Sequence, residues 1–294
     1  PMVGHPSPDR FVYEISDEIV EMSKQVGGME HIKALGIGVA SGNNITGCVE
    51  NASNLEWKGV FPMASMFKDR LGIGVALGND VTVSAIGESM YGAARGMHDF
   101  LCLSIGGGLG GGLVVNGQVA LGYCGRVGEI GHVQAFLKGG RKCTCGNVGC
   151  LESYVSKRGI LDSVKEILEQ NPHVDSPLRE IPREQMTLLD VRKALDEGDD
   201  VAHQTIEMTG VLLGRGLTSW VALTGLEAVV LTGTVADIFG KELVEDSLEA
   251  MNTQLLRAMR NKTKVLLSNL HGDEAALLYA SAYAWSAKEY NILL

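Results

Sequence analysis

The amino-acid sequence predicts an α/β fold, and three observations support this class. Short apolar runs that fit buried strands alternate with longer segments of helical periodicity. Polar, turn-forming residues follow the carboxyl ends of the first two strand candidates, at residues 41–44 and 78–80. Glycine is abundant at 38 residues and proline is scarce at 7, so the glycines mark tight turns and close packing rather than low-complexity sequence. Strands and helices that alternate in this way build layered α/β domains.

The first half of the chain supplies most of the strand candidates. Apolar residues at helical spacing predict a helix over residues 10–25, and residues 81–95 fit a closely packed helix that Gly96 ends. Asn116 and Gly117 lie between apolar segments, which is a strong signal for a β-hairpin. The strand candidates of this half are residues 35–39, 74–77, 100–105, 113–115 and 118–120.

Helices dominate the second half, after a glycine-rich, irregular stretch at residues 121–149. A strand over residues 228–231 runs into Thr232-Gly233-Thr234, and a further strand is predicted at 264–268. Asp199 and Asp200 can cap the helix that follows them. The helix candidates are residues 160–170, 187–197, 201–223, 241–260 and 274–288.

Composition and charge exclude several classes of protein. The 294 residues, 45% of them hydrophobic, suffice for one or two compact domains and exclude a disordered or fibrous chain. No stretch approaches 18 consecutive apolar residues and no basic flank leads into an apolar run, so we expect a soluble, intracellular protein without a membrane span or a secretion signal. The 25 basic and 35 acidic residues give a net charge of −10, which would repel nucleic acid from this chain alone.

Three of the six cysteines cluster within eight residues and indicate a metal site. Cys143, Cys145 and Cys150, with His132 eleven residues upstream of the first, offer three thiolates and one imidazole, a set suited to a closed tetrahedral zinc site. A closed site of this kind is structural, because no position is left open for water. The alternative is a group of solvated free thiols, which would be prone to oxidation. The other three cysteines fit reduced core thiols and are Cys48, Cys102 and Cys124.

The glycine run that begins at Gly106 matches the spacing of a dinucleotide fingerprint, Gly-x-Gly-x-x-Gly. A Rossmann turn leads from a strand into a helix, whereas this run leads into the predicted hairpin, so the match is weak. Backbone N–H groups of such a loop can still cradle phosphate, and the alternative is a flexible turn. No Gly-x4-Gly-Lys-Ser/Thr motif occurs, which excludes a P-loop.

Two further groups of polar residues are candidates for a site. Asp80, together with Asn79, lies at a junction between a strand and a helix, where its carboxylate could cap the helix or act as a general base. Glu129, His132 and Glu152 lie beside the predicted metal loop. Sugar hydroxyls both donate and accept hydrogen bonds, so convergent groups of this kind suit polyol recognition.

In this combination the chain resembles the ROK family of sugar kinases and of repressors built on the same sugar-binding fold, and is most similar to the bacterial glucokinase-like members. The resemblance runs from about Leu35 onward. Its most specific part joins Gly128-Glu129-Ile130-Gly131-His132 to the cysteine loop that ends at Glu152. Other matching segments are Asn54-Leu55 with Trp57-Lys58-Gly59-Val60, Asn79-Asp80 with Gly87-Glu88, and Gly92-Ala93-Ala94-Arg95-Gly96.

The resemblance implies an actin-like ATPase (ribonuclease H-like) fold of two α/β domains, with sugar and ATP in the cleft between them. The smaller domain would comprise residues 1–97 and 274–294, and the larger one residues 98–273. Asp80 would be the base that takes a proton from the sugar hydroxyl. The residues expected at the sugar are Asn54, Asn79, Asp80, Glu129, His132 and Glu152. The residues expected at ATP are Gly106, Gly107, Gly108, Gly110 and Gly111 at the phosphates, with Thr232, Gly233 and Thr234 near the adenosine.

The resemblance also implies structural Zn²⁺, ATP with Mg²⁺, a hexose or N-acetylhexosamine substrate, and a homodimer. The chain departs from the family in several places. It contains no Asp-x-Gly-Gly-Thr motif, so we expect the first strands of the small domain to be absent. Gly107 replaces the usual Thr of the phosphate loop, Gly78 replaces a residue that is often acidic or polar, and Thr82 replaces a common Asn. Two functions remain, an ATP-dependent hexose kinase and a non-catalytic sugar-binding regulator.

Overall fold

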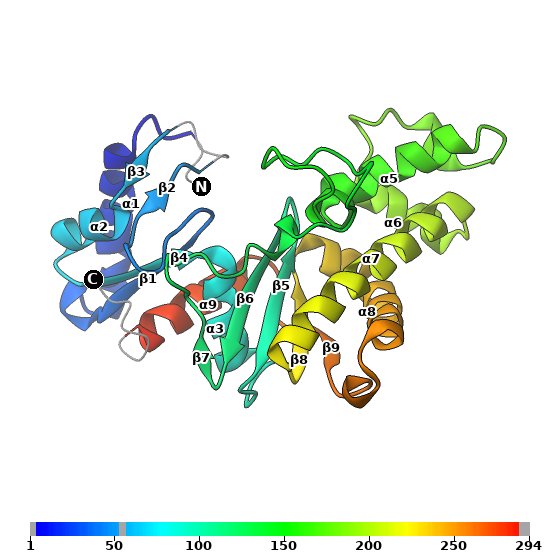
Figure 1. Ribbon diagram of the computed structural model, residues 1–294. Helices are drawn as coiled ribbons and strands as arrows, with labels where there is room; N and C mark the ends of the chain where they lie inside the picture. The colour runs from blue at the N-terminus through cyan, green and yellow to red at the C-terminus, as the bar shows by residue number, and fades with distance from the viewer. Residues whose placement is uncertain (1–3, 53–56, 288–294) are drawn as a thin grey trace. The chain divides into compact units, whose positions relative to one another are not determined.

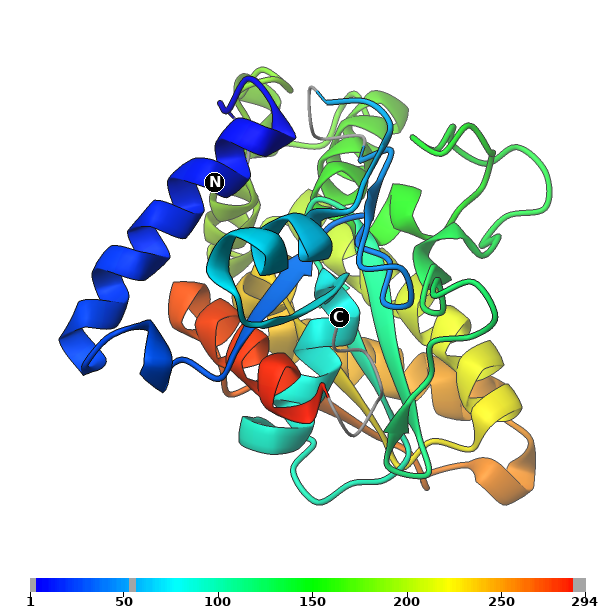
Figure 2. The same cartoon turned by 90° about the vertical axis from the view of Figure 1, so that its left-hand side faces the viewer.

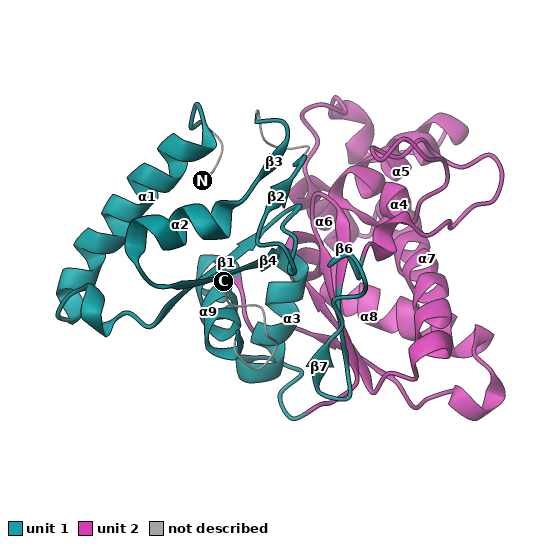
Figure 3. Ribbon diagram, turned by 60° about the vertical axis from the view of Figure 1, so that its left-hand side comes forward, with its two compact units in different colours: residues 1–96, 112–128, 272–294 teal, residues 97–111, 129–271 magenta. Residues whose placement is uncertain are grey.

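A computed structural model describes residues 4–52 and 57–287 of the chain. Two compact units are formed (Figure 3). Unit 1 comprises Pro1–Gly96, Gly112–Gly128 and Gly272–Leu294, and unit 2 comprises Met97–Gly111 and Glu129–His271. The sequence-based division placed residues 112–128 in the larger domain, whereas the structure assigns them to unit 1. Within the described ranges, none of the helices has the length and apolar character that crossing a membrane requires.

Unit 1 is built on two parallel strands, β1 (Ala34–Val39) and β4 (Gly74–Asn79), which pair from Ala34 with Gly74 to Val39 with Asn79. Helices α9 (Gly272–Ser286) and α3 (Asp80–Tyr91) pack together and against β1. Two glycines permit this close approach. A side chain at Gly36 would overlap the carbonyl oxygen of Ala280, and one at Gly87 would overlap Tyr279.

Helices α1 (Pro8–Ser23) and α2 (Met63–Leu71) pack together in the same unit, with α1 in blue in Figure 2. Ser7 begins α1 as its N-cap, because its side chain accepts a hydrogen bond from the Arg10 backbone. Aromatic rings join these helices to the antiparallel pair of β2 (Val49–Glu50) and β3 (Val60–Phe61). The rings of Phe11 and Phe67 meet edge to face, with centroids 6.2 Å apart, within a core that includes Leu77 of β4.

A five-stranded sheet has the order β7-β6-β5-β8-β9. Strands β5 (Phe100–Ile105), β8 (Ala228–Thr232) and β9 (Lys264–Leu267) belong to unit 2 and are parallel. They are rich in β-branched and aliphatic residues and β8 is buried throughout, as expected for strands covered on both faces. Strand β6 (Leu109–Val115) continues from unit 2 into unit 1, where it pairs with β7 (Gln118–Val119) through the predicted hairpin.

Helices cover the unit 2 sheet. Helix α8 (Thr234–Gln254) packs on β5, β8 and β9, and α7 (Asp200–Thr224) runs beside α8 (Figure 1). Asp199 caps α7 and Thr187 begins α6 with a complete capping box, so the polar residues before these helices set their starting points. The remaining helices of the unit are α4 (Glu152–Val155), α5 (Lys157–Gln170) and α6 (Leu188–Asp196).

The structure corrects several predicted boundaries. Helix α3 ends at Tyr91 rather than residue 95, because Gly92 leaves the helical conformation while its N–H still reaches the Glu88 carbonyl. Strand β6 begins at Leu109, so half of the glycine run is strand rather than loop. Helix α8 begins at Thr234 rather than residue 241. The sequence analysis did not predict α2, α4, β2 or β3, and the predicted end of the last helix at residue 288 lies outside the described residues.

Candidate functional site

The residues predicted to bind metal come together in unit 2. One ligand atom from each of His132, Cys143, Cys145 and Cys150 lies within 4.8 Å of the other three. The Cys145 and Cys150 sulfurs are 3.7 Å apart, and Nδ1 of His132 is 3.7 Å from Sγ of Cys143. Tetrahedral coordination with bonds of about 2.0–2.3 Å separates neighbouring ligand atoms by roughly 3.5–3.8 Å. Two of the printed separations match this spacing, and the 4.8 Å limit on the others means that the four side chains need to move by no more than about 1 Å to hold a tetrahedral zinc ion.

The backbone of residues 141–150 explains how the three thiols converge. The Cys143 N–H donates to the Asn147 carbonyl at 2.8 Å, and the Gly149 N–H donates to the Arg141 carbonyl at 2.8 Å. Gly146 and Gly149 have positive φ angles of 93° and 80°, which glycine adopts without strain. These hydrogen bonds and glycine conformations fold residues 141–150 back on themselves, which brings the three thiols together. The glycines that flank the cysteines are thus part of the ligand geometry.

The thiols differ in acidity. Burial opposes ionisation of Cys143, but hydrogen bonds from its neighbours, first from Cys145, outweigh it and lower the pKa of Cys143 to about 7. Burial and the adjacent thiols raise the pKa of Cys150 to about 12. A metal ion binds thiolates, so loading of this set must displace a proton from Cys150.

His132 presents its two ring nitrogens to different neighbours. It ends a 3₁₀ turn over Ile130–His132, with Nδ1 on the side of Cys143 and Nε2 3.8 Å from a carboxylate oxygen of Glu129. The Glu129 side chain is 56% exposed and that of His132 is 31% exposed, so both can be reached from solvent. One nitrogen can therefore serve a metal while the other faces a ligand beside Glu129.

Glu152, the first residue of α4, connects the cysteine loop to the glycine run. Its Oε2 accepts a hydrogen bond from the Leu109 N–H at 2.9 Å, and its Oε1 accepts one from Thr144 Oγ1 at 3.4 Å. The Lys157 N–H donates to the Gly106 carbonyl at 2.8 Å. Unit 2 thus brings Glu129, His132 and Glu152 to the metal loop, as the sequence predicted, and holds the start of the glycine run against the same loop.

The glycine run is divided between a turn and a strand. Residues 106–108 form the turn, in which the Gly106 N–H donates to the Gly108 carbonyl at 3.0 Å. A side chain at Gly106 or Gly107 would point into open space. Gly110 and Gly111 lie within β6, and a side chain at Gly111 would overlap Ile130. Only the turn at residues 106–108 therefore remains a candidate for phosphate contact. Gly111 instead allows β6 to pack closely against Ile130.

The predicted adenosine residues join a strand to a helix. Thr232 ends β8, and its hydroxyl donates to the Leu103 carbonyl at 3.3 Å. Gly233 has a φ of 87° and packs against the Ile105 backbone, and Thr234 begins α8. Ile105 directly precedes the 106–108 turn. The two strand ends that carry the candidate nucleotide residues are therefore neighbours in one sheet.

Asn79 and Asp80 lie in unit 1, at the junction of β4 and α3. Asn79 is the N-cap, because its side chain accepts a hydrogen bond from the Val81 N–H at 3.1 Å. Asp80 is the first residue of the helix, and its Oδ1 also accepts from the Val81 N–H, at 3.0 Å. Asn79 is therefore the N-cap, and the Asp80 carboxylate shares the same N–H donor with it. Asn54 lies outside the described residues.

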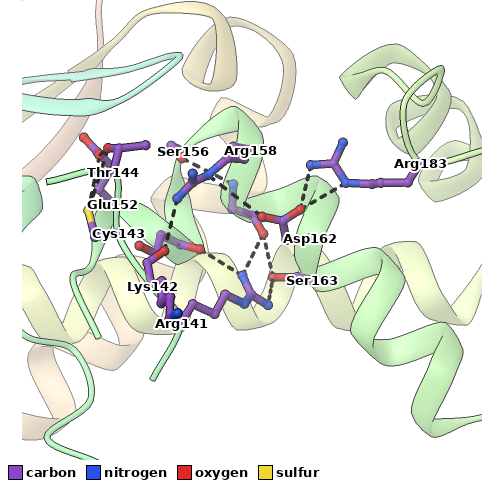
Figure 4. Close-up of polar contacts among 12 residues, drawn as sticks. Arg141, Lys142, Cys143, Thr144, Glu152, Ser156, Arg158, Asp162, Ser163 and Arg183 are labelled. Atoms are coloured by element: carbon purple, nitrogen blue, oxygen red, sulfur yellow. Dashed lines mark hydrogen bonds and ion pairs between the residues drawn. The ribbon is translucent and has the colours of Figure 1, made fainter. Parts of the chain in front are cut away.

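The sequence analysis missed Arg141, which fastens the metal loop to helices α4 and α5 (Figure 4). All five N–H donors of its guanidinium are used. They reach both carboxylate oxygens of Glu166 at 2.8 and 2.7 Å, the Ser163 hydroxyl and the Ser153 and Gly159 carbonyls at 2.9 Å each. The guanidinium also lies 4.5 Å from the centre of the Tyr154 ring. Its position two residues before Cys143 was the available signal, but its partners are fixed only by the fold.

Comparisons with known proteins bear on this arrangement. The xylose repressor of Caldicellulosiruptor bescii is 28% identical over 270 residues, which are 92% of this chain and 66% of that protein. The glucokinase of Halalkalibacterium halodurans is 30% identical over 220 residues, which are 73% of this chain and 66% of that protein. The crystal structure of a ROK family glucokinase from Streptomyces griseus in complex with glucose and AMPPNP aligns with a TM-score of 0.75 and 26% identity, over 93% of this chain and 88% of that chain.

Fold and comparisons together define an α/β protein of the actin-like ATPase class, in which a Cys₃His cluster stands beside acidic side chains. The model of the ROK family matches residues 5–287, and the chain belongs to the ROK family. The family and the fold class predicted from the sequence are thereby confirmed. The chain spans between half and two thirds of the length of the first curated relatives it matches, 66% for the xylose repressor and 50% for the Escherichia coli regulator NagC.

Proposed function

We propose that this protein catalyses ATP-dependent phosphorylation of a hexose or an N-acetylhexosamine. The observation that carries the proposal is that Asn79, and not Asp80, is the N-cap residue of α3. Asn79 supplies the helix cap, so Asp80 is not needed for that role at the carboxyl end of β4. In open α/β sheets ligands bind beyond the carboxyl ends of the strands, where a carboxylate can meet a substrate hydroxyl. The glucokinase relatives support the same assignment.

In the proposed mechanism Asp80 accepts the proton of the sugar hydroxyl as that oxygen attacks the terminal phosphate. Glu129, Glu152 and Nε2 of His132 hold other ring hydroxyls, together with Asn79. The turn at residues 106–108 offers backbone donors to phosphate. Transfer of a phosphoryl group depends mainly on alignment and on neutralisation of charge, to which Mg²⁺ bound with ATP contributes. A well-placed base adds roughly 10² to 10⁴-fold.

We assign the Cys₃His cluster to structural Zn²⁺. Its four protein ligands leave no open position, so its contribution is to the shape of the loop rather than to activation of water. With Nδ1 of His132 committed to the metal, the ring is held so that Nε2 stays on the side of Glu129. A His132 ring held in this way would form a fixed part of the proposed sugar site.

The second candidate function is a sugar-binding regulator without catalysis. Gly107 favours it, because the phosphate turn lacks the hydroxyl donor that a threonine would supply there. The similarity to the xylose repressor supports the same function. Both candidates predict sugar binding at the metal loop, and they differ in turnover.

A coupled assay with glucose, N-acetylglucosamine and N-acetylmannosamine at saturating MgATP tests the proposal, with calorimetry to measure sugar binding. We expect one of these sugars to be phosphorylated, and Asp80→Asn to lower kcat about 10² to 10⁴-fold with the sugar Kd largely retained. Asp69→Asn, on the exposed side of α2, is the control. Binding without turnover in the unsubstituted protein would select the regulator, and full activity in Asp80→Asn would reject the base.

A further inference from the structure

A buried asparagine, Asn44, joins three parts of unit 1 that lie far apart in the sequence. It follows β1 in the 40–47 loop, and only 3% of its surface is exposed. Its Nδ2 donates to the Gly125 carbonyl at 3.2 Å. Its Oδ1 accepts from the Asn79 N–H at 3.2 Å and from the Tyr283 hydroxyl at 3.1 Å. One amide side chain thus connects the residue before Asp80 to helix α9 and to the segment that leads to Glu129.

The neighbouring Gly78 makes room for these contacts. A side chain at position 78 would overlap Oδ1 of Asn44 and come within 2.5 Å of the Tyr283 hydroxyl. The φ of Gly78 is not positive, so backbone conformation does not demand glycine here. The glycine is instead explained by the polar atoms that occupy the space beside the β4 backbone.

Tyr283 secures the acceptor side of Asn44. Its side chain is fully buried, and burial raises its pKa, so the phenol remains a protonated donor throughout the neutral range. The hydroxyl also lies 3.4 Å from the Leu77 carbonyl. With a fixed donor on one side and the Asn79 N–H on the other, the orientation of the Asn44 amide is set by its partners.

We propose that Asn44 is a positioning residue for Asp80, an inference that rests on the proposed kinase function. Its contact fixes the peptide N–H of Asn79 at the point where β4 turns into α3, and Asp80 is the next residue. Its Nδ2 fixes Gly125, four residues before Glu129. The side chain does not touch the reacting atoms. It holds the strand end that carries the base and the segment that leads to a sugar-binding residue.

A purely structural role and a positioning role predict different kinetics. Loss of packing alone would lower the melting temperature and leave the kinetics of the folded fraction unchanged. Misplacement of a base by about 1 Å lowers kcat by up to roughly 10²-fold. We therefore expect Asn44→Ala to lower kcat 10 to 100-fold at saturating sugar and MgATP, with the KM for ATP changed less than threefold.

Further variants test the individual contacts of Asn44. Tyr283→Phe removes only the hydroxyl donor, and we expect a two to fivefold loss of kcat. Tyr279→Phe is the matched control, because Tyr279 lies one turn away on α9, is also buried and donates to Glu88 rather than to Asn44. We expect its kcat to equal that of the unsubstituted protein. Gly78→Ala should reproduce Asn44→Ala, since the added methyl group displaces Oδ1.

Amide hydrogen exchange provides a readout that does not depend on catalysis. We expect the Asn79 amide to exchange at least tenfold faster in Asn44→Ala, and at its original rate in Tyr279→Phe. An Asn79 amide that stays protected in folded Asn44→Ala or Gly78→Ala would overturn the inference, as would an unchanged kcat in an active enzyme. If no sugar is phosphorylated by the unsubstituted protein, the kinase function fails and Asn44 has no base to position. Faster exchange would then establish only that it orders the β4 end.

Discussion

Oε2 of Glu152 accepts a hydrogen bond from the backbone N–H of Leu109 at 2.9 Å. This contact joins the second residue after the last cysteine of the metal loop to the strand that follows the 106–108 turn. The other carboxylate oxygen reaches the Thr144 hydroxyl inside the metal loop. Glu152 therefore ties the proposed sugar, metal and phosphate regions of unit 2 together. Its substitution should affect more than one of them.

We expect Glu152→Gln to weaken sugar binding about 10 to 100-fold. The amide can still accept from the Leu109 N–H, but it loses the charge that strengthens hydrogen bonds from sugar hydroxyls, worth about 1.5–3 kcal/mol. Calorimetry with glucose and N-acetylglucosamine, without nucleotide, measures the change directly. Glu169→Gln is the control, because Glu169 is exposed on α5. Unaltered affinity in Glu152→Gln would remove Glu152 from the sugar site.

Gly107→Thr should strengthen the interaction of the turn with phosphate. The position has open space for a side chain and does not have a positive φ, so threonine fits without strain. Its hydroxyl adds one donor, and we expect the KM for ATP to fall about 10 to 100-fold, since one hydrogen bond to a charged group contributes about 1.5–3 kcal/mol. Gly107→Ala controls for the added bulk. Equal KM values for the threonine and alanine variants would argue against phosphate binding at this turn.

We expect elemental analysis to find about one zinc per chain. Cys145→Ser should lower the zinc content and weaken sugar binding, because the loop that orients His132 loses one of its four ligands. Cys124→Ser removes an exposed thiol outside the cluster and should change neither quantity. Removal of zinc by a chelator should weaken sugar binding in the same way. A zinc-free protein with full sugar affinity would contradict the assigned role of the metal.

Arg141→Met should destabilise the metal loop even when zinc is bound. The substitution breaks five hydrogen bonds of a side chain that is only 13% exposed, although the side chain of its partner Glu166 is 46% exposed and can be rehydrated. We expect a loss of about 1–3 kcal/mol of folding free energy and faster release of zinc to a chelator. Arg183→Met is the matched control, because Arg183 pairs with Asp162 of the same helix without touching the loop (Figure 4). Equal zinc release in the two variants would leave Arg141 without a role in the loop.

The regular elements of the fold were largely predictable, and the exceptions depend on tertiary contacts. Phe100–Ile105 is apolar except for Ser104 and was predicted to the residue. Strand β6 was predicted too short, because its glycines disfavour a strand locally. A side chain at Gly112 would overlap the Val81 carbonyl, a contact no local pattern reveals. Strands β2 and β3 have two residues each, too few for a periodic signal.

In the candidate site, too, some residues were predictable from the sequence and others depend on tertiary contacts. The cysteine cluster was predictable because three of its ligands lie within eight residues and carry distinctive chemistry. Arg141 finds its partners 12 to 25 residues away, on helices whose facing surface the sequence does not specify. The partners of Asn44 lie 35, 81 and 239 residues away. Residues that bind are recognised by type and spacing, whereas residues that position them are recognised only in the fold.

Asp246 on α8 gives the protein a pH-dependent stability that does not involve the site. Burial first, and then the charges of Glu207 and three glutamates of α8, raise its pKa from 3.8 to about 6. The unfolded chain therefore ionises more easily than the folded one, so stability falls as pH rises from about 4 to about 6 and then stays level.

We expect Asp246→Asn to remove the loss of folding stability that accompanies ionisation of Asp246. A shift of this size corresponds to about 1–3 kcal/mol, so the variant should be more stable than the unsubstituted protein at pH 7 and equal to it near pH 4. Asparagine has the same shape, which matters because α7 approaches closely at Gly210. Melting temperatures recorded from pH 4 to 8 measure the difference. A variant that is no more stable at pH 7, or whose advantage does not shrink toward pH 4, would show that ionised Asp246 carries no such cost.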